Sequence, residues 1–186
     1  MKKWGLCLLI LGMLSGCSDG SGELERGMEL RNKLLKASVF SFDADITADY
    51  GDKLHQFSMA CRTDEEGKVT FTVTQPESIS GITGVIGETG GALTFDDQAL
   101  SFELLTDEQL SPVSAPWILV RTLRSGYLRS ACQEEQGLHL TLDDSYDEDA
   151  LMVDIWLDGQ DLPRRAEILY DGRRILTVLV KNPVLS

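Results

Sequence analysis

The chain has 186 residues, 42% of them hydrophobic, which suits one folded domain with a core of its own. Its 30 acidic and 17 basic side chains give a formal net charge of -13, which argues against nucleic acid as a partner because phosphates need a basic surface. Two histidines and four cysteines leave little material for a metal cluster or a histidine-based catalytic centre, so we expect no cofactor and no metal.

The first 16 residues have the pattern of a signal peptide. Lys2 and Lys3 precede an apolar run from Trp4 to Leu14, whose ~11 residues span ~16 Å as a helix and fall short of a ~30 Å hydrocarbon core. A charged start and a short apolar run followed by small residues are typical of a cleaved signal rather than of a membrane-spanning helix.

The apolar run ends in Leu14-Ser15-Gly16-Cys17, which resembles the lipobox of bacterial lipoproteins. The resemblance implies that cleavage removes residues 1–16, that the Cys17 thiol carries a diacylglycerol, and that its new amine carries a further acyl chain such as palmitate. Each buried methylene contributes ~0.8 kcal/mol, so these chains hold the protein at the membrane. An ordinary secretory signal with a chance cysteine is the alternative. Residues 17–23 then form the lipidated cysteine and a flexible tether.

Two helices are expected in the mature chain. Residues Leu24 to Ala37 place apolar side chains on a broad helical face. The second helix is expected to begin with Ser114 as its N-cap, to carry Pro116 in its first turn and to stop at Gly126.

Most of the remaining chain alternates between apolar and polar residues, as half-buried strands do. From Phe40 to Tyr50 every even position is apolar or aromatic and every odd position is polar. The glycine-rich stretch 75–91 is interpreted as a strand with breaks or bulges. Further strands are expected over residues 57–61, 69–73, 92–95, 100–104, 127–133, 138–142, 151–157, 166–170 and 174–180.

These elements predict an α+β domain that is mainly β, with one curved antiparallel sheet covered by about two helices. Their order over residues 24–182 is similar to that of the bacterial lipoprotein-carrier (LolA/LolB-like) superfamily. The most similar part is the closing segment, with Ile155-Trp156-Leu157-Asp158, Leu162-Pro163, Glu167-Ile168, Gly172 and Asn182. The resemblance implies that residues 24–186 form an unclosed β-barrel whose concave apolar face is plugged by helices and holds acyl chains.

The resemblance also implies a function outside the cytoplasm. The protein is expected to be a non-enzymatic lipoprotein of the bacterial cell envelope, anchored in the membrane through Cys17, whose half-barrel binds or carries a lipid, a lipoprotein or another acylated ligand. The alternative is an envelope interaction or scaffold protein with a filled barrel and no ligand, as in the germination lipoproteins of this fold that act as protein partners.

The apolar side of the sheet is the candidate ligand-binding surface. In one interpretation its residues only form the core beneath the second helix; in the other, the helices cover them incompletely and leave a pocket for acyl chains. Alternation alone predicts both arrangements. The residues expected on this face are Phe40, Phe42, Ile46, Phe57, Met59, Phe71, Val73, Phe95 and Phe102, with Trp117 of the second helix above them.

Cys61 and Cys132 remain in the folded body once Cys7 is cleaved off and Cys17 is lipidated. In an oxidising compartment they form either a disulfide or two separate thiols, and the sequence leaves both open. No C-x-x-C pattern supports a redox motif or a zinc site.

No catalytic residue is predicted. The G-x-S-x-G match at residues 16–20 spans the expected cleavage site, and His55 and His139 lie far apart in the sequence. The acidic run 143–149 departs from a calcium loop and is interpreted as a solvated hairpin tip.

Overall fold

A computed structural model of the chain describes residues 21–95, 98–102, 105–106, 109–147 and 150–186. Residues 1–16 and the lipobox Cys17 therefore lie outside the described residues. In chain order the elements are α1 (Ser21–Lys36), β1 (Phe40–Asp49), β2 (Leu54–Thr63), β3 (Val69–Gln75), the 3-10 turn η1 (Glu77–Ile79), β4 (Thr83–Gly87), β5 (Gly90–Phe95), β6 (Gln98–Phe102), β7 (Leu105–Thr106), β8 (Gln109–Leu110), the 3-10 turn η2 (Pro112–Ser114), α2 (Ala115–Ser125), β9 (Tyr127–Glu134), β10 (Gly137–Asp143), β11 (Met152–Leu157), β12 (Pro163–Tyr170) and β13 (Arg173–Leu185).

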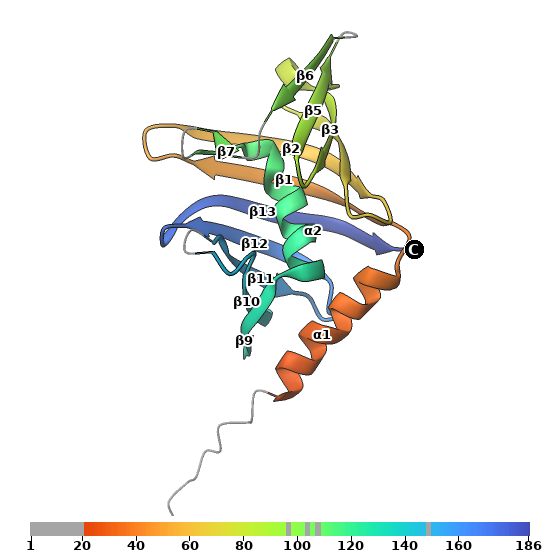
Figure 1. Cartoon of the computed structure of the whole chain (residues 1–186), viewed down its shortest axis with the longest axis vertical. Helices are drawn as coiled ribbons and strands as arrows, with labels where there is room; N and C mark the ends of the chain where they lie inside the picture. The colour runs from red at the N-terminus through yellow and green to blue at the C-terminus, as the bar shows by residue number, and fades with distance from the viewer. Residues whose placement is uncertain (1–20, 96–97, 103–104, 107–108, 148–149) are drawn as a thin grey trace, which may run out of the picture.

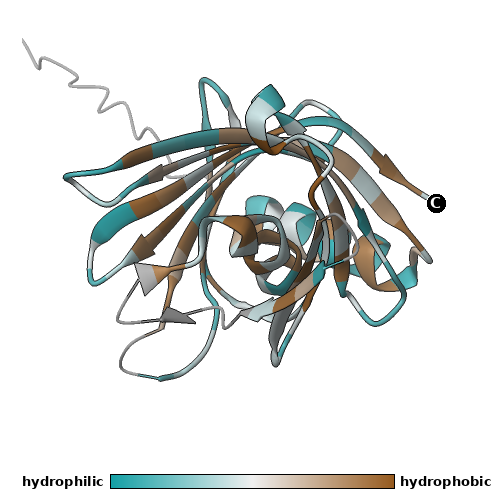
Figure 2. Ribbon diagram, turned by 90° about the horizontal axis from the view of Figure 1, so that it is seen from above, coloured by the Kyte–Doolittle hydropathy of each residue, from teal (hydrophilic) through white to brown (hydrophobic). Residues whose placement is uncertain are grey.

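Eleven of the described strands form one antiparallel sheet, in the order β6-β5-β4-β3-β2-β1-β13-β12-β11-β10-β9. Strands β6 and β9 are its two edges, so the sheet is curved but unclosed (Figure 1). The pairing of β1 with β13 joins the two ends of the described chain in the middle of the sheet. Figure 2 shows the sheet curving around helix α2. The predicted mainly β architecture with a curved sheet and two helices is confirmed.

The apolar alternation of β1 explains its place at the centre of the sheet. Its burial alternates along the strand, and Phe40, Phe42 and Ile46 all face the core. The backbone of β1 pairs with β2 on one side and with β13 on the other, and its apolar face is buried in the core cluster. Strand β13 follows β1 as far as Leu185, five residues past the predicted end at 180, because it pairs with β1 along almost its whole length.

Helix α2 begins and ends at the predicted residues, but Ser114 makes no side-chain capping hydrogen bond, since its Oγ donates to the Ser111 carbonyl oxygen instead. Ser114 precedes it, Pro116 lies in its first turn, and Gly126 follows its last residue. A Cβ at Gly126 would lie 2.6 Å from the Thr122 carbonyl oxygen, so only glycine fits where the chain turns into β9. Among the described residues, neither helix combines the length and the apolar composition that spanning a membrane requires.

The stretch 75–91 is not one strand with breaks or bulges but the end of β3, the turn η1, the strand β4 and the start of β5. Pro76 has no N–H for the sheet ladder, so β3 ends at Gln75 and the turn η1 separates it from β4. Strand β5 then starts at Gly90, where φ is +114° and a side chain would be strained.

Candidate functional site

The concave face of the sheet carries apolar rows that run across neighbouring strands. One row follows the cross-strand pairs Cys61–Phe71, Phe71–Gly84, Gly84–Leu93 and Leu93–Leu100 from β2 to β6. The Phe71 ring packs directly over Gly84, where a Cβ would lie 2.5 Å from Phe71 Cζ. Gly84 therefore gives the ring its space, and the row continues past it to the sheet edge.

The middle of this face is covered by α2. Seven of the predicted face residues are 5% exposed or less and belong to one core cluster: Phe40, Phe42, Ile46, Met59, Phe71, Val73 and Trp117. Phe57 is partly buried and packs against the same cluster. The helix contributes apolar side chains on several of its sides, because the curved sheet surrounds it (Figure 2). The structure thus brings these eight residues together as packed core.

Helix α1 covers the end of the concave face formed by β9 and β10. Leu30 and Leu34 of α1 are buried, and the helix contacts both β9 and α2. Gly27 permits the close approach, because a Cβ there would already lie 3.1 Å from Leu140 Cδ2 and 3.3 Å from Leu128 Cδ2. This end of the sheet is therefore closed by a helix that packs tightly on it.

The opposite end of the concave face is left open. Along the row described above, the exposed fraction rises from 1% at Phe71, through the half-buried Leu93, to 65% at Leu100. Phe95, two residues after Leu93 on the same face of β5, is 49% exposed. In Figure 1 strands β5 and β6 extend beyond the end of α2, so the helix does not cover them. We call Leu93, Phe95 and Leu100 the open end. Phe102 lies in β6, but its side chain is outside the described part of the structure.

A pocket of about 400 Å³ is lined by residues from the last turn of α1, from α2 (mostly its C-terminal half) and from the β2–β3 and β4–β5 turns. Its apolar wall includes Trp117 and Leu35, and its charged lining includes Lys68, Arg121 and Arg124 together with Glu66 and Glu88, with Lys68 paired to Glu66 at 2.7 Å. The β4–β5 hairpin lines this pocket with its turn, and further along β5 it carries Leu93 and Phe95 of the open end. The pocket therefore offers an apolar surface beside two arginines, with two glutamates also in its lining.

The arginines of this pocket are held in place by contacts with several elements. Arg121 lies with its guanidinium carbon 5.2 Å from the centre of the Trp117 ring and its Nη1 3.3 Å from the Asp144 carboxylate. Burial raises the pKa of the Asp144 carboxyl. The hydrogen bond from the Leu151 N–H and the charge of Arg121 partly offset this rise. Arg124 donates hydrogen bonds of 2.9 Å to the Leu34 and Glu65 carbonyl oxygens. These contacts thus hold the guanidinium groups of Arg121 and Arg124 in place.

The two cysteines of the folded body are free thiols, so the disulfide left open by the sequence is not formed. Cys61 is buried on the concave face of β2, and Cys132 is exposed on β9, with five strands between them in the sheet. Burial raises the pKa of the Cys61 thiol to about 12, with the charge of Asp43 as a smaller cause.

One group of polar residues was not anticipated as a unit. Cys132, Glu134 and His139 converge on the outer face of β9 and β10, whereas His55 lies exposed on β2. The sequence signal was the short 135–136 turn, because pairing the two strands across it puts His139 opposite Cys132. The described residues of the acidic run lie at the end of β10 and in the β10–β11 turn, but Asp144 is not solvated as expected: its side chain is 11% exposed and its carboxylate accepts a 2.8 Å hydrogen bond from the Leu151 N–H. Residues 148–149 are outside the described part.

The sequence matches no protein-family model and no curated protein. Solved structures similar to the chain include an outer-membrane lipoprotein-sorting protein domain from Vibrio parahaemolyticus, at 10% identity over 90% of this chain and 94% of that one, with a TM-score of 0.47. A LolA superfamily protein from Nitrosomonas europaea is 8% identical over 86% of this chain and 93% of its own, with a TM-score of 0.44. Lipoprotein LppX from Mycobacterium tuberculosis is 10% identical over 89% and 96%, with a TM-score of 0.43.

The superfamily that the sequence resembles is thus among the structural neighbours of the chain. At this distance the similarity concerns the fold alone. The similarity therefore does not identify what the protein binds.

Proposed function

We propose that this protein is a non-enzymatic lipoprotein of the bacterial cell envelope that binds an acyl chain of a lipid or of another lipoprotein at its open end. The observation that supports the proposal is the rise in exposure along one concave row, from 1% at Phe71 to 65% at Leu100. Large apolar side chains on the inside of a curved sheet are exposed to water here, and covering them with a hydrophobic ligand lowers the free energy of the system.

The charge of the protein supports a lipid tether as its link to the membrane. Removal of residues 1–16 takes away Lys2 and Lys3 and no acid, so the mature charge is 15 minus 30, or -15. An anionic bilayer surface repels such a body, so attachment falls to the acyl chains on Cys17. Because α1 already begins at Ser21, the tether expected over residues 17–23 is limited to the residues between Cys17 and that helix, and these would let the folded domain reach a ligand.

The arginines of the pocket at the C-terminal half of α2 suit the polar part of such a ligand. Lipid head groups are commonly anionic, and Arg121 and Arg124 are guanidinium groups fixed beside the apolar Trp117. An acyl chain would contact the apolar side chains of Leu93 and Leu100. An anionic group would pair with the arginines of the pocket. The head-group contact would weaken with added salt because the pocket is open to solvent.

A protein partner is the second candidate, and two observations favour it. Helix α2 fills the middle of the concave face with buried side chains such as Ile118 and Leu119, so the ligand surface is limited to one end. Strand β6 is also an edge of the sheet, and its unpaired backbone side suits an added strand from a partner. An apolar strand from an envelope protein would cover the open end as an acyl chain would.

The test is native mass spectrometry of the Ser18–Ser186 domain, exported by its producing cells and purified without detergent. We expect acyl species of defined mass that are lost on denaturation. Leu100→Asp is expected to reduce their occupancy at least tenfold, because a carboxylate on the open end opposes burial beneath an acyl chain. Leu54→Asp is the matched control, since Leu54 is 62% exposed on β2, away from the open end.

A protein free of acyl species, or equal occupancy in both variants, would contradict lipid binding at the open end. Co-purification of a protein that is lost in Leu100→Asp but kept in Leu54→Asp would favour the second candidate.

A further inference from the structure

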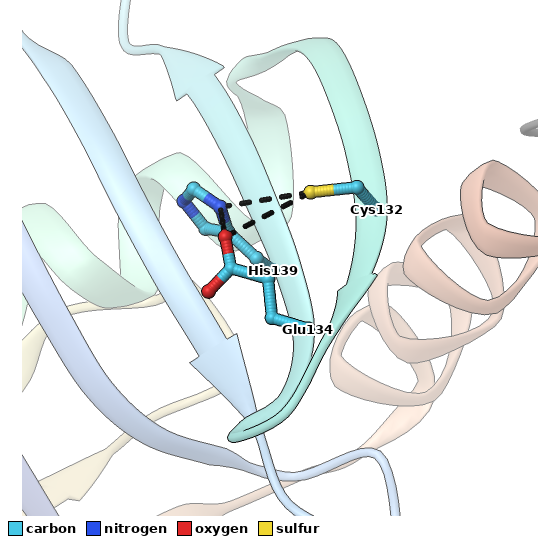
Figure 3. A group of neighbouring side chains, drawn as sticks. All are labelled: Cys132, Glu134 and His139. Atoms are coloured by element: carbon cyan, nitrogen blue, oxygen red, sulfur yellow. Dashed lines mark hydrogen bonds and ion pairs between the residues drawn. The ribbon is translucent and has the colours of Figure 1, made fainter.

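Three side chains of different chemistry converge on the outer face of the sheet, on the side away from the helices. Cys132 and Glu134 come from β9 and His139 comes from β10 (Figure 3). Cys132 Sγ lies 3.8 Å from His139 Nδ1 and 3.9 Å from Glu134 Oε1, and the Nδ1–Oε1 distance is 2.8 Å. Cys132 and Glu134 are exposed, so the group is open to solvent.

The strand register brings these residues together. Cys132 pairs directly with His139 across the β9–β10 hairpin, and Glu134 lies two residues further along β9 on the same face. The three groups therefore stand on paired strands, which hold side chains more rigidly than a loop does.

A second layer of contacts orients two of the three groups. Trp156 Nε1 donates a 2.9 Å hydrogen bond to Glu134 Oε2, and its ring stacks on His139 with centroids 4.5 Å apart and planes 2° apart. His139 Nε2 lies 3.0 Å from the Asp154 carboxylate, which also accepts a 2.8 Å hydrogen bond from Thr141. Glu134 Oε1 and His139 Nδ1 face Cys132. The other carboxylate oxygen of Glu134 is hydrogen-bonded to Trp156, and the other ring nitrogen of His139 lies against Asp154.

We propose that Cys132 Sγ, Glu134 Oε1 and His139 Nδ1 bind one divalent transition-metal ion, with Zn²⁺ as the best match. Thiolate, imidazole and carboxylate are the ligands that zinc takes, whereas Ca²⁺ and Mg²⁺ prefer oxygen alone. Tetrahedral zinc at about 2.3 Å from sulfur and 2.0–2.2 Å from nitrogen and oxygen places ligand atoms roughly 3.4–3.6 Å apart. The two sulfur distances are within a few tenths of an ångström of this, and the Nδ1–Oε1 contact opens by roughly half an ångström.

The outer contacts have the arrangement that zinc-binding histidines use. A ligating imidazole usually presents its second ring nitrogen to a carboxylate, as His139 Nε2 does to Asp154. On binding, the Cys132 thiol releases its proton to solvent and a water completes the coordination on the exposed side. The ion would join the edge strand β9 to β10 from the outside of the sheet, independently of any ligand at the open end.

The experiment is a Zn²⁺ titration of the full chain, purified in detergent and stripped with a chelator, against a chromophoric competitor. We expect Cys132→Ser and His139→Gln each to weaken Zn²⁺ binding at least tenfold. His55→Gln and Glu135→Gln are the matched controls and should leave the affinity unchanged, since neither residue belongs to the cluster.

Cobalt gives a readout that a merely structural change would not move. Co²⁺ bound to the wild-type chain is expected to show a sulfur-to-metal charge-transfer band that Cys132→Ser abolishes. Asp154→Asn should keep the band but weaken affinity by about 10–100-fold, as expected of a positioning residue. Failure of the wild-type chain to bind Zn²⁺ at micromolar concentrations, or equal binding by Cys132→Ser and His139→Gln, would overturn the proposal.

Discussion

The two ends of the sheet carry the same apolar alternation and yet differ in how they are covered. In β10, β11 and β12 eight inward side chains are 2% exposed or less: Leu138, Leu140, Leu142, Val153, Ile155, Leu157, Ala166 and Ile168. At the β5–β6 end, Phe95 and Leu100 stay about half or more in water. The closed end is packed as a protein core, whereas the open end has the apolar pattern of a core strand but lies at the surface.

The difference comes from the helices rather than from the strands. Helix α1 packs on the closed end through the close approach at Gly27, and α2 crosses the middle of the sheet. Strands β5 and β6 extend past the reach of both (Figure 1). An apolar stripe therefore identifies a strand face that is suited to burial, whereas the length and position of neighbouring helices determine whether the face is buried.

The largest expected difference between the two ends is the loss of stability caused by a Leu→Ala substitution. Leu140→Ala at the closed end should lower the free energy of unfolding by about 2–5 kcal/mol, because it opens a cavity beneath α1. Leu100→Ala at the open end should change it by less than ~0.5 kcal/mol, because that side chain has little packing to lose. Urea denaturation of the two variants measures both values. Similar losses at both positions would show that the open end is covered in solution.

A smaller effect is expected from the polar contacts of the closed end. Arg26 of α1 donates a 3.1 Å hydrogen bond through Nε to Asp161, in the turn between β11 and β12, and both side chains are partly exposed. A double-mutant cycle with Arg26→Ala and Asp161→Ala should give a coupling energy of about 0.2–1 kcal/mol, because solvent screens the pair. A coupling of several kcal/mol would mean that charge, not apolar packing, holds α1 on the sheet.

The sequence predicts the strands well where one physical signal dominates. The alternation from Phe40 to Tyr50 predicts β1 almost residue for residue, and Ser114, Pro116 and Gly126 predict both ends of α2. In the stretch 75–91, several glycines and Pro76 offered competing signals. There the chain forms a 3-10 turn between two strands, because Pro76 interrupts the ladder.

The candidate site was less predictable because it depends on distances between elements. The predicted face residues contain both the buried Phe71 and the exposed Phe95, and nothing in their local sequence separates them. Only the end of α2 relative to β5 makes that distinction. The Cys132–Glu134–His139 group depends in the same way on the hairpin register. Its short turn at residues 135–136 is the one sequence feature that predicts this register.

The most direct test of the open end is photo-cross-linking with a fatty acid that carries a photoactivatable group on its chain. Labelled peptides of the folded protein would be mapped by mass spectrometry. We predict saturable labelling of peptides that contain Leu93, Phe95 or Leu100, competed by unlabelled fatty acid, and no labelling of the inward residues of β10 and β11. Labelling within β10 and β11, or no saturable labelling anywhere, would contradict the account.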